Sequence, residues 1–315
     1  MIKIGCVSID VSHPKTFANI MAENKLDMKY EYVYKSSFRS DENADWFVNK
    51  FGLKGKVENI ADMVNSVDVG FIHACNWDKH LDLALPFIEK GKPVFIDKPI
   101  IGSMDDIKKV RELVKNGAKI FGGSAARAAQ EIRDFLDLPI EERGEIISVH
   151  GTCGVDEFNY GIHIVENLSE NVKDKIASCR YIGVSNVNGT EPVEAYSIKF
   201  QNGVLGTYHI AKDVYHQFDI SILTTTGTHY FRIDVNLAYS NYIKELYSQF
   251  SSGESNLIDV ETLINCTEAM LCGKKSKEEC NGAEVGINQL SGTENFDGYA
   301  FEEFYSKTAG DIYKD

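Results

Sequence analysis

The first 122 residues alternate short apolar runs with segments of helical spacing, and this order constrains the fold more than any other feature. Strands are expected at residues 3–9, 30–34, 69–74, 93–96 and 119–122, and helical patterns at 14–23, 41–51, 60–67, 79–90 and 103–117. Strands separated by helices of this length favour a parallel, doubly wound sheet. The sequence therefore predicts an α/β chain that begins with a Rossmann-like domain over residues 1–121.

The pattern changes after about residue 122. Two hairpins are expected, one turning at Asn202-Gly203, where Asn-Gly supplies the positive φ of a tight turn, and one turning at Gly227. A further strand is expected at 146–152, and helices are expected at 159–168 and 258–271. Residues 122–315 are thus predicted to form an α+β domain with a mostly antiparallel sheet, and the cleft between the two domains is the expected ligand site.

Charge and composition limit the possible partners. The net charge of −14 repels phosphate backbones, so nucleic acid is not an expected partner. No apolar stretch reaches the roughly 20 residues of a membrane span, and the N-terminus lacks the pattern of a signal peptide. The seven cysteines include no Cys-x-x-Cys, which predicts reduced thiols in a cytoplasmic protein. Cys266, Cys272 and Cys280 fit no metal motif, so no metal site is expected.

The loop after the first strand lacks the glycines of a dinucleotide fingerprint. It reads Ser8-Ile9-Asp10-Val11-Ser12-His13, and Asp10 places a carboxylate where a glycine usually lets the backbone approach a pyrophosphate. The N–H groups at the start of the following helix can still bind an anion, and Ser12 and His13 can donate hydrogen bonds. This loop leaves two alternatives open: a dinucleotide bound without the glycines, or a Rossmann-like domain that no longer binds one.

A second group of residues carries a family resemblance. Asn76, His80, Gly91-Lys92 and Asp97-Lys98-Pro99 lie within one short stretch. Their order and spacing resemble the glucose-fructose oxidoreductase / inositol dehydrogenase / rhizopine catabolism (Gfo/Idh/MocA) family, with Asp-Lys-Pro in place of Glu-Lys-Pro. The resemblance continues to about residue 290 through matching positions in the second half. These positions are Arg127, Gly161, His163 and Gly227-Thr228.

The resemblance implies an NAD(P)-dependent oxidoreductase that transfers hydride between nicotinamide and a secondary alcohol of a sugar, polyol or related hydroxy compound. It implies that Lys98 and His163 transfer the proton and that the residue at Asn159 orients His163. The family usually has Asp where this chain has Asn159, so the negative charge beside the histidine is missing. Glu166, three residues after His163, is at the one helical offset that could replace it.

The resemblance also implies a cofactor site, and the residues expected around it are Ser8, Asp10, His13, Ser36, Arg39, Asn76, His80, Asp97, Lys98 and Arg127. After the second strand the chain has Lys35, Ser36 and Arg39 and no carboxylate before Asp41, which favours NADP over NAD. Family members commonly form homodimers or homotetramers. The alternative function is a non-catalytic member that binds a ligand or partner protein, and a third is a lyase or hydrolase that holds its cofactor tightly.

Overall fold

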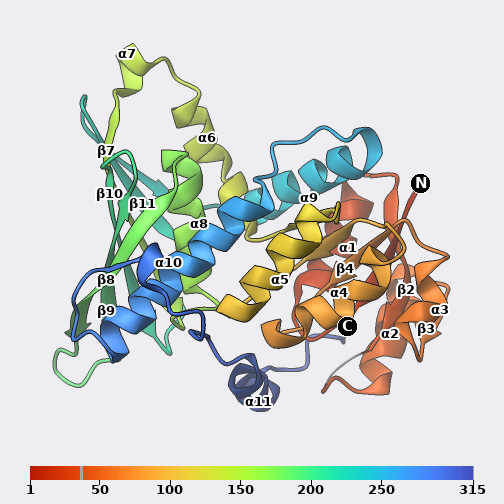
Figure 1. The fold of residues 1–315 in the computed structure, drawn as a ribbon. Coiled ribbons are helices and arrows are strands. Elements are labelled where there is room, and N and C mark those ends of the chain that lie inside the picture. Colours follow the sequence, from red (N-terminus) through yellow and green to blue (C-terminus); the bar gives the residue numbers. More distant parts are fainter. Residues whose placement is uncertain (36–37, 315) are drawn as a thin grey trace. The chain divides into compact units, whose positions relative to one another are not determined.

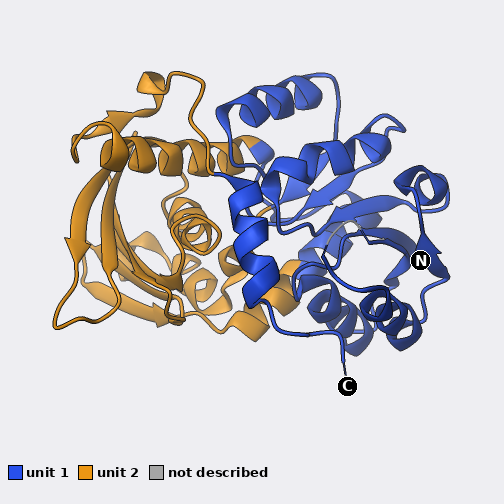
Figure 2. Ribbon diagram, turned by 90° about the horizontal axis from the view of Figure 1, so that it is seen from below, with its two compact units in different colours: residues 1–122, 243–260, 297–315 blue, residues 123–242, 261–296 orange. Residues whose placement is uncertain are grey.

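The computed structural model describes residues 1–35 and 38–314 (Figure 1). Its internal contacts divide the chain into two compact units, which Figure 2 distinguishes by colour. The first unit contains residues 1–122, 243–260 and 297–315, and the second contains residues 123–242 and 261–296. Residues 243–260 and 297–315, which the sequence division assigns to the second domain, therefore pack with the first unit.

The first unit is built on a six-stranded parallel sheet with the order β3-β2-β1-β4-β5-β6. Its strands are β1 (Ile2–Val7), β2 (Met28–Tyr34), β3 (Gly55–Val57), β4 (Val69–Ile72), β5 (Val94–Ile96) and β6 (Ile120–Gly122). Its helices are α1 (His13–Glu23), α2 (Asp41–Phe51), α3 (Ile60–Val64), α4 (His80–Ile88), α5 (Met104–Lys115) and α11 (Gly298–Thr308). This topology confirms the predicted doubly wound fold.

Local signals in the sequence explain several of these boundaries. Ser40 accepts a hydrogen bond from Asn43 N at the start of α2, and Gly52 ends that helix in the left-handed conformation. Ser103 caps α5 by accepting a hydrogen bond from Asp106 N. The short β3 and the C-terminal helix α11 were not predicted.

The second unit is built on a seven-stranded mixed sheet with the order β12-β11-β7-β10-β9-β8-β13, in which only β7 and β10 pair in parallel among the described strands. Its strands are β7 (Ile146–Val155), β8 (Ile176–Ser185), β9 (Val193–Phe200), β10 (Leu205–Lys212), β11 (Asp219–Thr224), β12 (Thr228–Arg232) and β13 (Val285–Gly286). This sheet confirms the predicted α+β character of the second half.

The second unit also contains helices, wholly or in part. They are α6 (Gln130–Leu136), α7 (Ile140–Arg143), α8 (Gly161–Val172), α9 (Val235–Ser252) and α10 (Val260–Glu278). One face of the sheet packs against α8, because a Cβ at Gly151 of β7 would lie 2.4 Å from Ile164. Helix α9 begins in the second unit and ends among residues of the first.

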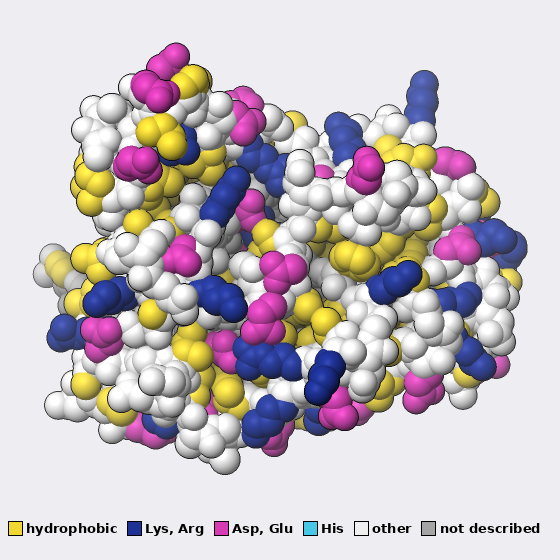
Figure 3. Space-filling model, turned by 45° about the horizontal axis from the view of Figure 1, so that its top comes forward, with side chains coloured by type: hydrophobic (Ala, Val, Ile, Leu, Met, Phe, Trp, Pro, Cys, Tyr) yellow, Lys and Arg dark blue, Asp and Glu magenta, His cyan; other side chains and the backbone are white. Residues whose placement is uncertain are grey.

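Two further properties of the described residues concern membrane crossing and surface charge. None of their helices combines the length and the apolarity that crossing a bilayer requires. On the face drawn in Figure 3, acidic and basic side chains are interspersed, and the picture shows no continuous basic stripe there.

Candidate functional site

The carboxyl edge of the parallel sheet is the place where folds of this topology bind ligands. The strand order reverses between β1 and β4, and ligands of doubly wound sheets lie outside the strand ends at such a switch point. The loops that follow β1, β2, β4 and β5 carry most of the residues predicted to contact a cofactor. Ser36 is one of these residues and lies outside the described part of the chain.

The loop after β1 folds its acidic side chain inward. Ser8 adopts a φ of 73°, and its hydroxyl accepts a hydrogen bond from Asp10 N. Asp10 is fully buried, and its Oδ2 accepts a hydrogen bond from Cys75 N at 3.0 Å. Its Oδ1 is buried and has no hydrogen-bond partner among the described residues. Burial raises the pKa of Asp10 to about 6, so the folded chain disfavours charge on this carboxyl.

Asp97, at the end of β5, holds two imidazoles rather than exposing its carboxylate. Its Oδ2 pairs with His13 Nδ1 at 2.7 Å and with His73 Nδ1 at 2.8 Å. The hydroxyl of Tyr30 lies 2.9 Å from His73 Nε2 and extends the network into the core. Burial alone would raise the pKa of Asp97, but the imidazoles of His13 and His73 hold it well below its usual value. His13 and Asp97 are thus bound to each other at the edge where cofactor contacts were predicted.

His80 and Lys98 differ in how they are placed. His80 is fully buried, and its Nδ1 and Nε2 lie 3.1 Å from Ile100 O and 2.8 Å from Ala74 O. These contacts join the loops after β4 and β5. Lys98 is only partly buried, its backbone N–H donates to Asp97 Oδ1, and the Lys98–Pro99 bond is cis.

Residues 297–314, named here the C-terminal segment, cover this edge of their own unit. In the loop after β1, the Tyr313 hydroxyl donates to Val11 O at 2.9 Å, and Tyr313 is only 3% exposed. After β2, Arg39 donates to Gly310 O and Asp10 O and is itself buried. After β4, Asn76 donates to Glu302 Oε2 at 2.9 Å. One continuous segment therefore contacts three loops of the edge.

The segment also brings a second carboxylate to the edge. Glu302 pairs with Lys79 Nζ at 2.6 Å, and ligand atoms of Asp10, Cys75 and Glu302 lie within 4.8 Å of one another. No metal was predicted here, and the ammonium of Lys79 already compensates the charge of Glu302. We therefore interpret the group as the docking contact of α11.

In this conformation the edge does not fit a dinucleotide. The C-terminal segment contacts the loop that would hold a pyrophosphate, and Arg39, which was predicted to favour a 2′-phosphate, donates to two backbone carbonyls instead. The carboxyls of Asp10 and Glu302 would also repel phosphate oxygens. Sequence reasoning missed Glu302 and Tyr313, although Asp297 as a helix cap and the aromatic pair Phe301 and Tyr305, four residues apart, signal α11.

The second unit contains a separate buried network around His163. Its Nδ1 lies 2.6 Å from Ser124 Oγ, and Ser124 N donates to Glu166 Oε2, also at 2.6 Å. Arg127 Nε lies 3.2 Å from the same carboxylate oxygen. Arg127, expected near the cofactor, is thus an ion-pair partner of Glu166 in the second unit. Ser124 was not predicted, although its position two residues after a parallel strand marks the end of the sheet.

Asn159, the predicted orienter of His163, has other partners in the structure. Its backbone N–H and its Nδ2 both donate to the Asp156 carboxylate, Nδ2 at 3.5 Å. These bonds close the turn that precedes α8. The Ser124 hydroxyl lies at His163 Nδ1, and the orienting role of Asn159 stays a prediction.

A small pocket of the second unit opens beside His163. Apart from His163 and Tyr239, its lining is apolar, with Ala125, Ala126, Phe218, Ile233, Val235 and Ala238. The Phe218 ring centroid lies 5.0 Å from that of His163. The pocket encloses only about 10 Å³, which is room for about one water molecule, so beside the imidazole it can take one small polar group.

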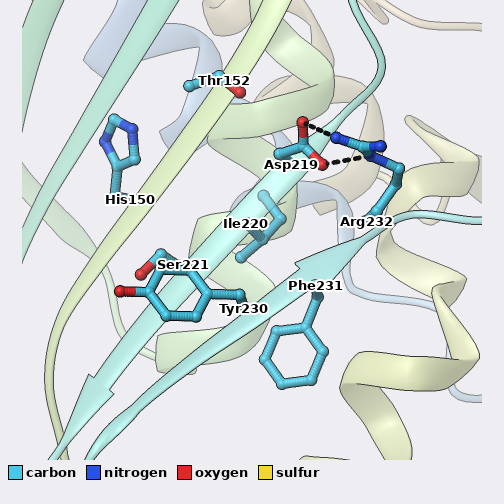
Figure 4. Close-up of a pocket in the computed structure, with 8 residues that line it drawn as sticks. All are labelled: His150, Thr152, Asp219, Ile220, Ser221, Tyr230, Phe231 and Arg232. Atoms are coloured by element: carbon cyan, nitrogen blue, oxygen red, sulfur yellow. Dashed lines mark hydrogen bonds and ion pairs between the residues drawn. The ribbon is translucent and has the colours of Figure 1, made fainter.

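A larger hollow of about 400 Å³ lies on the opposite face of the second sheet (Figure 4). Its lining includes His150 and Ser221, and Arg232 and Asp219 form an ion pair at its rim, drawn as dashed lines. Strand side chains alternate between faces, so His150 points away from the face on which Gly151 meets α8. This hollow is distinct from the His163 pocket.

Comparison with known proteins agrees with the fold and with the motifs of the first unit. Residues 13–123 match the family described as "Oxidoreductase family, NAD-binding Rossmann fold", GFO_IDH_MocA. Over these residues the chain is similar to the Gfo/Idh/MocA oxidoreductase family. No curated protein matches it in sequence.

Several solved structures share the fold of this chain. Apo scyllo-inositol dehydrogenase from Lactobacillus casei has a TM-score of 0.76 at 17% identity, covering 91% of this chain and 98% of its own. Myo-inositol 2-dehydrogenase from Lactobacillus plantarum has a TM-score of 0.76 at 14% identity, covering 91% and 99%. The Lactobacillus casei enzyme with bound NAD(H) and scyllo-inositol has a TM-score of 0.73 at 17% identity, covering 91% and 99%. At these identities the likeness concerns the fold.

Proposed function

We propose that this chain is an NAD(P)-dependent oxidoreductase that acts on a secondary alcohol of a polyol or related hydroxy compound. The observation that carries the proposal is the Ser124–His163 pair, which places an oriented imidazole in the wall of an apolar pocket. The family match and the position of Lys98 at the carboxyl edge of the first sheet add support. The names of the inositol dehydrogenases that share the fold favour a polyol.

The chemistry of His163 differs from that of a histidine beside a carboxylate. The Ser124 hydroxyl fixes one ring nitrogen but supplies no negative charge, and Arg127 neutralises Glu166 nearby. We therefore propose that His163 Nε2 holds the substrate hydroxyl, and that either His163 or Lys98 accepts its proton.

NADP(H) is the favoured cofactor in this proposal, because Lys35 and Arg39 follow β2 without an intervening acidic residue among those described. Arg39 can serve a 2′-phosphate only if it gives up its bond to Gly310 O. NAD(H) is the alternative cofactor. Measuring the affinity of the chain for NADPH and for NADH distinguishes the two.

Self-association and location complete the proposal. The uncovered face of the second sheet presents Leu205, Leu223 and Tyr230, which are 55%, 41% and 79% exposed. We propose this face as the interface of a homodimer or homotetramer.

The seven cysteines are all free thiols, which supports a cytoplasmic protein.

Two measurements on the full-length protein test the function. Dissociation constants for NADPH and NADH are measured first, and cyclitols and sugars are then screened for cofactor reduction at 340 nm. Lys98→Met should reduce kcat at least a hundredfold and leave cofactor affinity within a factor of three, whereas Lys90→Met, at an exposed position, should change neither. Full activity of Lys98→Met would remove Lys98 from the mechanism, and no cofactor binding would refute the dehydrogenase.

Ser124→Ala tests whether Ser124 positions His163. It should lower kcat more than it changes KM and should shift the pH profile, because the imidazole loses the partner of Nδ1. Ser124→Thr should restore most of the activity, since it keeps the hydroxyl. Loss of stability alone, with an unchanged pH profile, would contradict the positioning role.

A second candidate function follows from the covered edge of the first unit. A non-catalytic family member would bind a hydroxylated ligand or a partner protein and keep the C-terminal segment permanently docked. Absence of NADPH and NADH binding at millimolar concentration, together with binding of a polyol detected by calorimetry, would favour this candidate.

A further inference from the structure

We propose that the C-terminal segment, residues 297–314, is an internal competitor of the dinucleotide, so that a dinucleotide binds to the first unit only after the segment has left. This inference rests on the proposed function and concerns the regulation of the same site. The segment contacts the loops after β1, β2 and β4, which surround the switch point of the sheet. Two bodies that need the same loops bind in competition.

Docking of the segment uses specific polar bonds at both of its ends. Near the start of α11, Asp78 Oδ2 accepts from Gly298 N at 2.9 Å, and Glu302 accepts from Asn76 and Lys79. At the other end, Lys15 Nζ donates to Ile312 O at 2.9 Å. These bonds anchor the segment to the loop after β4 and to the first turn of α1.

Aromatic contacts add to these bonds. The Trp77 ring lies 5.1 Å from that of Phe301, and the Trp46 ring lies 5.9 Å from that of Tyr313. The same helix also has Phe304, which is 52% exposed. Phe301 and Phe304 are therefore a matched pair of phenylalanines on α11, one docked and one facing solvent.

Close approach at the start of α11 shows how tightly it is fitted. A Cβ at Gly298 would lie 2.3 Å from Asn76 Oδ1 and 3.0 Å from Asp78 Oδ2. No side chain fits between the helix and the loop after β4, so there is no space for a ligand at that point while α11 is docked.

The competition predicts an affinity that depends on how often the segment is released. The apparent dissociation constant equals the intrinsic constant divided by the fraction of molecules with the segment released. If the segment is docked in about 99% of molecules, the apparent affinity falls about a hundredfold. Substitutions that weaken docking should therefore tighten dinucleotide binding, which is the reverse of their usual effect near a binding site.

Hydrogen exchange of the full-length protein with saturating NADP⁺ provides the first test. Peptides from the C-terminal segment should exchange faster when the dinucleotide binds, while peptides from the loop after β1 become protected. A ligand that binds beneath a docked segment would protect both regions. Tryptophan fluorescence gives a parallel signal, since Trp46 and Trp77 both contact the segment and the chain has no other tryptophan.

Affinity measurements on variants provide the second test. Phe301→Ala and Tyr313→Ala should bind NADP⁺ at least tenfold more tightly than the unmodified chain, and Phe304→Ala should bind it equally. Tyr313→Phe, which removes only the bond to Val11 O, should give a smaller gain of about threefold and guards against misfolding of the alanine variant. The intermediate value follows from the loss of one hydrogen bond.

The outcomes separate this inference from the proposed function. Equal affinity in all forms, with a segment that stays protected, would overturn the competition and leave the oxidoreductase intact. No binding of NADP⁺ or NAD⁺ by any form at millimolar concentration would overturn both. Faster exchange of the segment together with tighter binding by the docking variants supports both.

Discussion

Asp10→Asn should make the first unit more stable at neutral pH, because the buried carboxyl resists ionisation. The pKa of Asp10 rises from 3.8 to about 6 on folding, mainly through burial, with the charge of Glu302 contributing. A shift of about two units corresponds to about 3 kcal/mol, at about 1.4 kcal/mol per unit. The folded chain binds the proton of Asp10 more tightly than the unfolded chain does, so protonation of Asp10 stabilises the folded chain. This stabilisation is intact below about pH 4 and is lost as the pH rises through 6.

The assay compares unfolding free energies of the two forms from urea titrations between pH 4.5 and pH 8. Tryptophan fluorescence reports on the first unit, where both tryptophans lie. The asparagine keeps an oxygen that accepts the hydrogen bond from Cys75 N. The unfolding free energy of Asp10→Asn minus that of the unmodified chain should therefore rise by about 2 to 3 kcal/mol between pH 4.5 and pH 8. Glu302→Gln should reduce that growth. A difference between the forms that stays constant with pH would refute the reasoning.

Three further predictions concern the buried networks. Glu166→Gln should destabilise the second unit by about 3 kcal/mol, measured by calorimetry, because Arg127 stays buried without its anion, while the exposed Glu141→Gln should have little effect. Gly123→Ala should cost at least about 2 kcal/mol in the same assay, since φ is +88° and its Cβ would lie 2.7 Å from Glu166 Oε2. Tyr30→Phe should cost about 1 kcal/mol in urea unfolding, through loss of its bond to His73.

Most of the first unit was predictable because its signals are local. Ser40, Gly52 and Ser103 fix helix ends through bonds to their own neighbours, and the apolar runs between the helices are long enough to identify strands. Strand β3 escaped prediction because its three residues, Gly55–Val57, carry no periodic pattern. It is defined by pairing with β2, which is a tertiary property.

The candidate site was less predictable, since its partners are distant in sequence. The resemblance identified Lys98 and His163 by spacing, but the partner of His163 is Ser124, 39 residues away. The resemblance also implied that Asn159 orients His163. Helix α8 begins at Gly161, so Asn159 lies in the preceding turn, where it donates to Asp156, and its orienting role stays a prediction.

The acidic loop after β1 gains a physical meaning from its partners. In a glycine fingerprint, backbone N–H groups around the switch point remain available for the pyrophosphate of a dinucleotide. Here Asp10 takes one of them, from Cys75, and Glu302 of the C-terminal segment takes the side-chain donors of Asn76 and Lys79. The chain thus brings two carboxyls of its own to an edge whose topology suits phosphates. Asp10 and Glu302 are anionic acceptors, as the pyrophosphate of a dinucleotide is. Replacing either carboxyl by an amide should therefore strengthen dinucleotide binding.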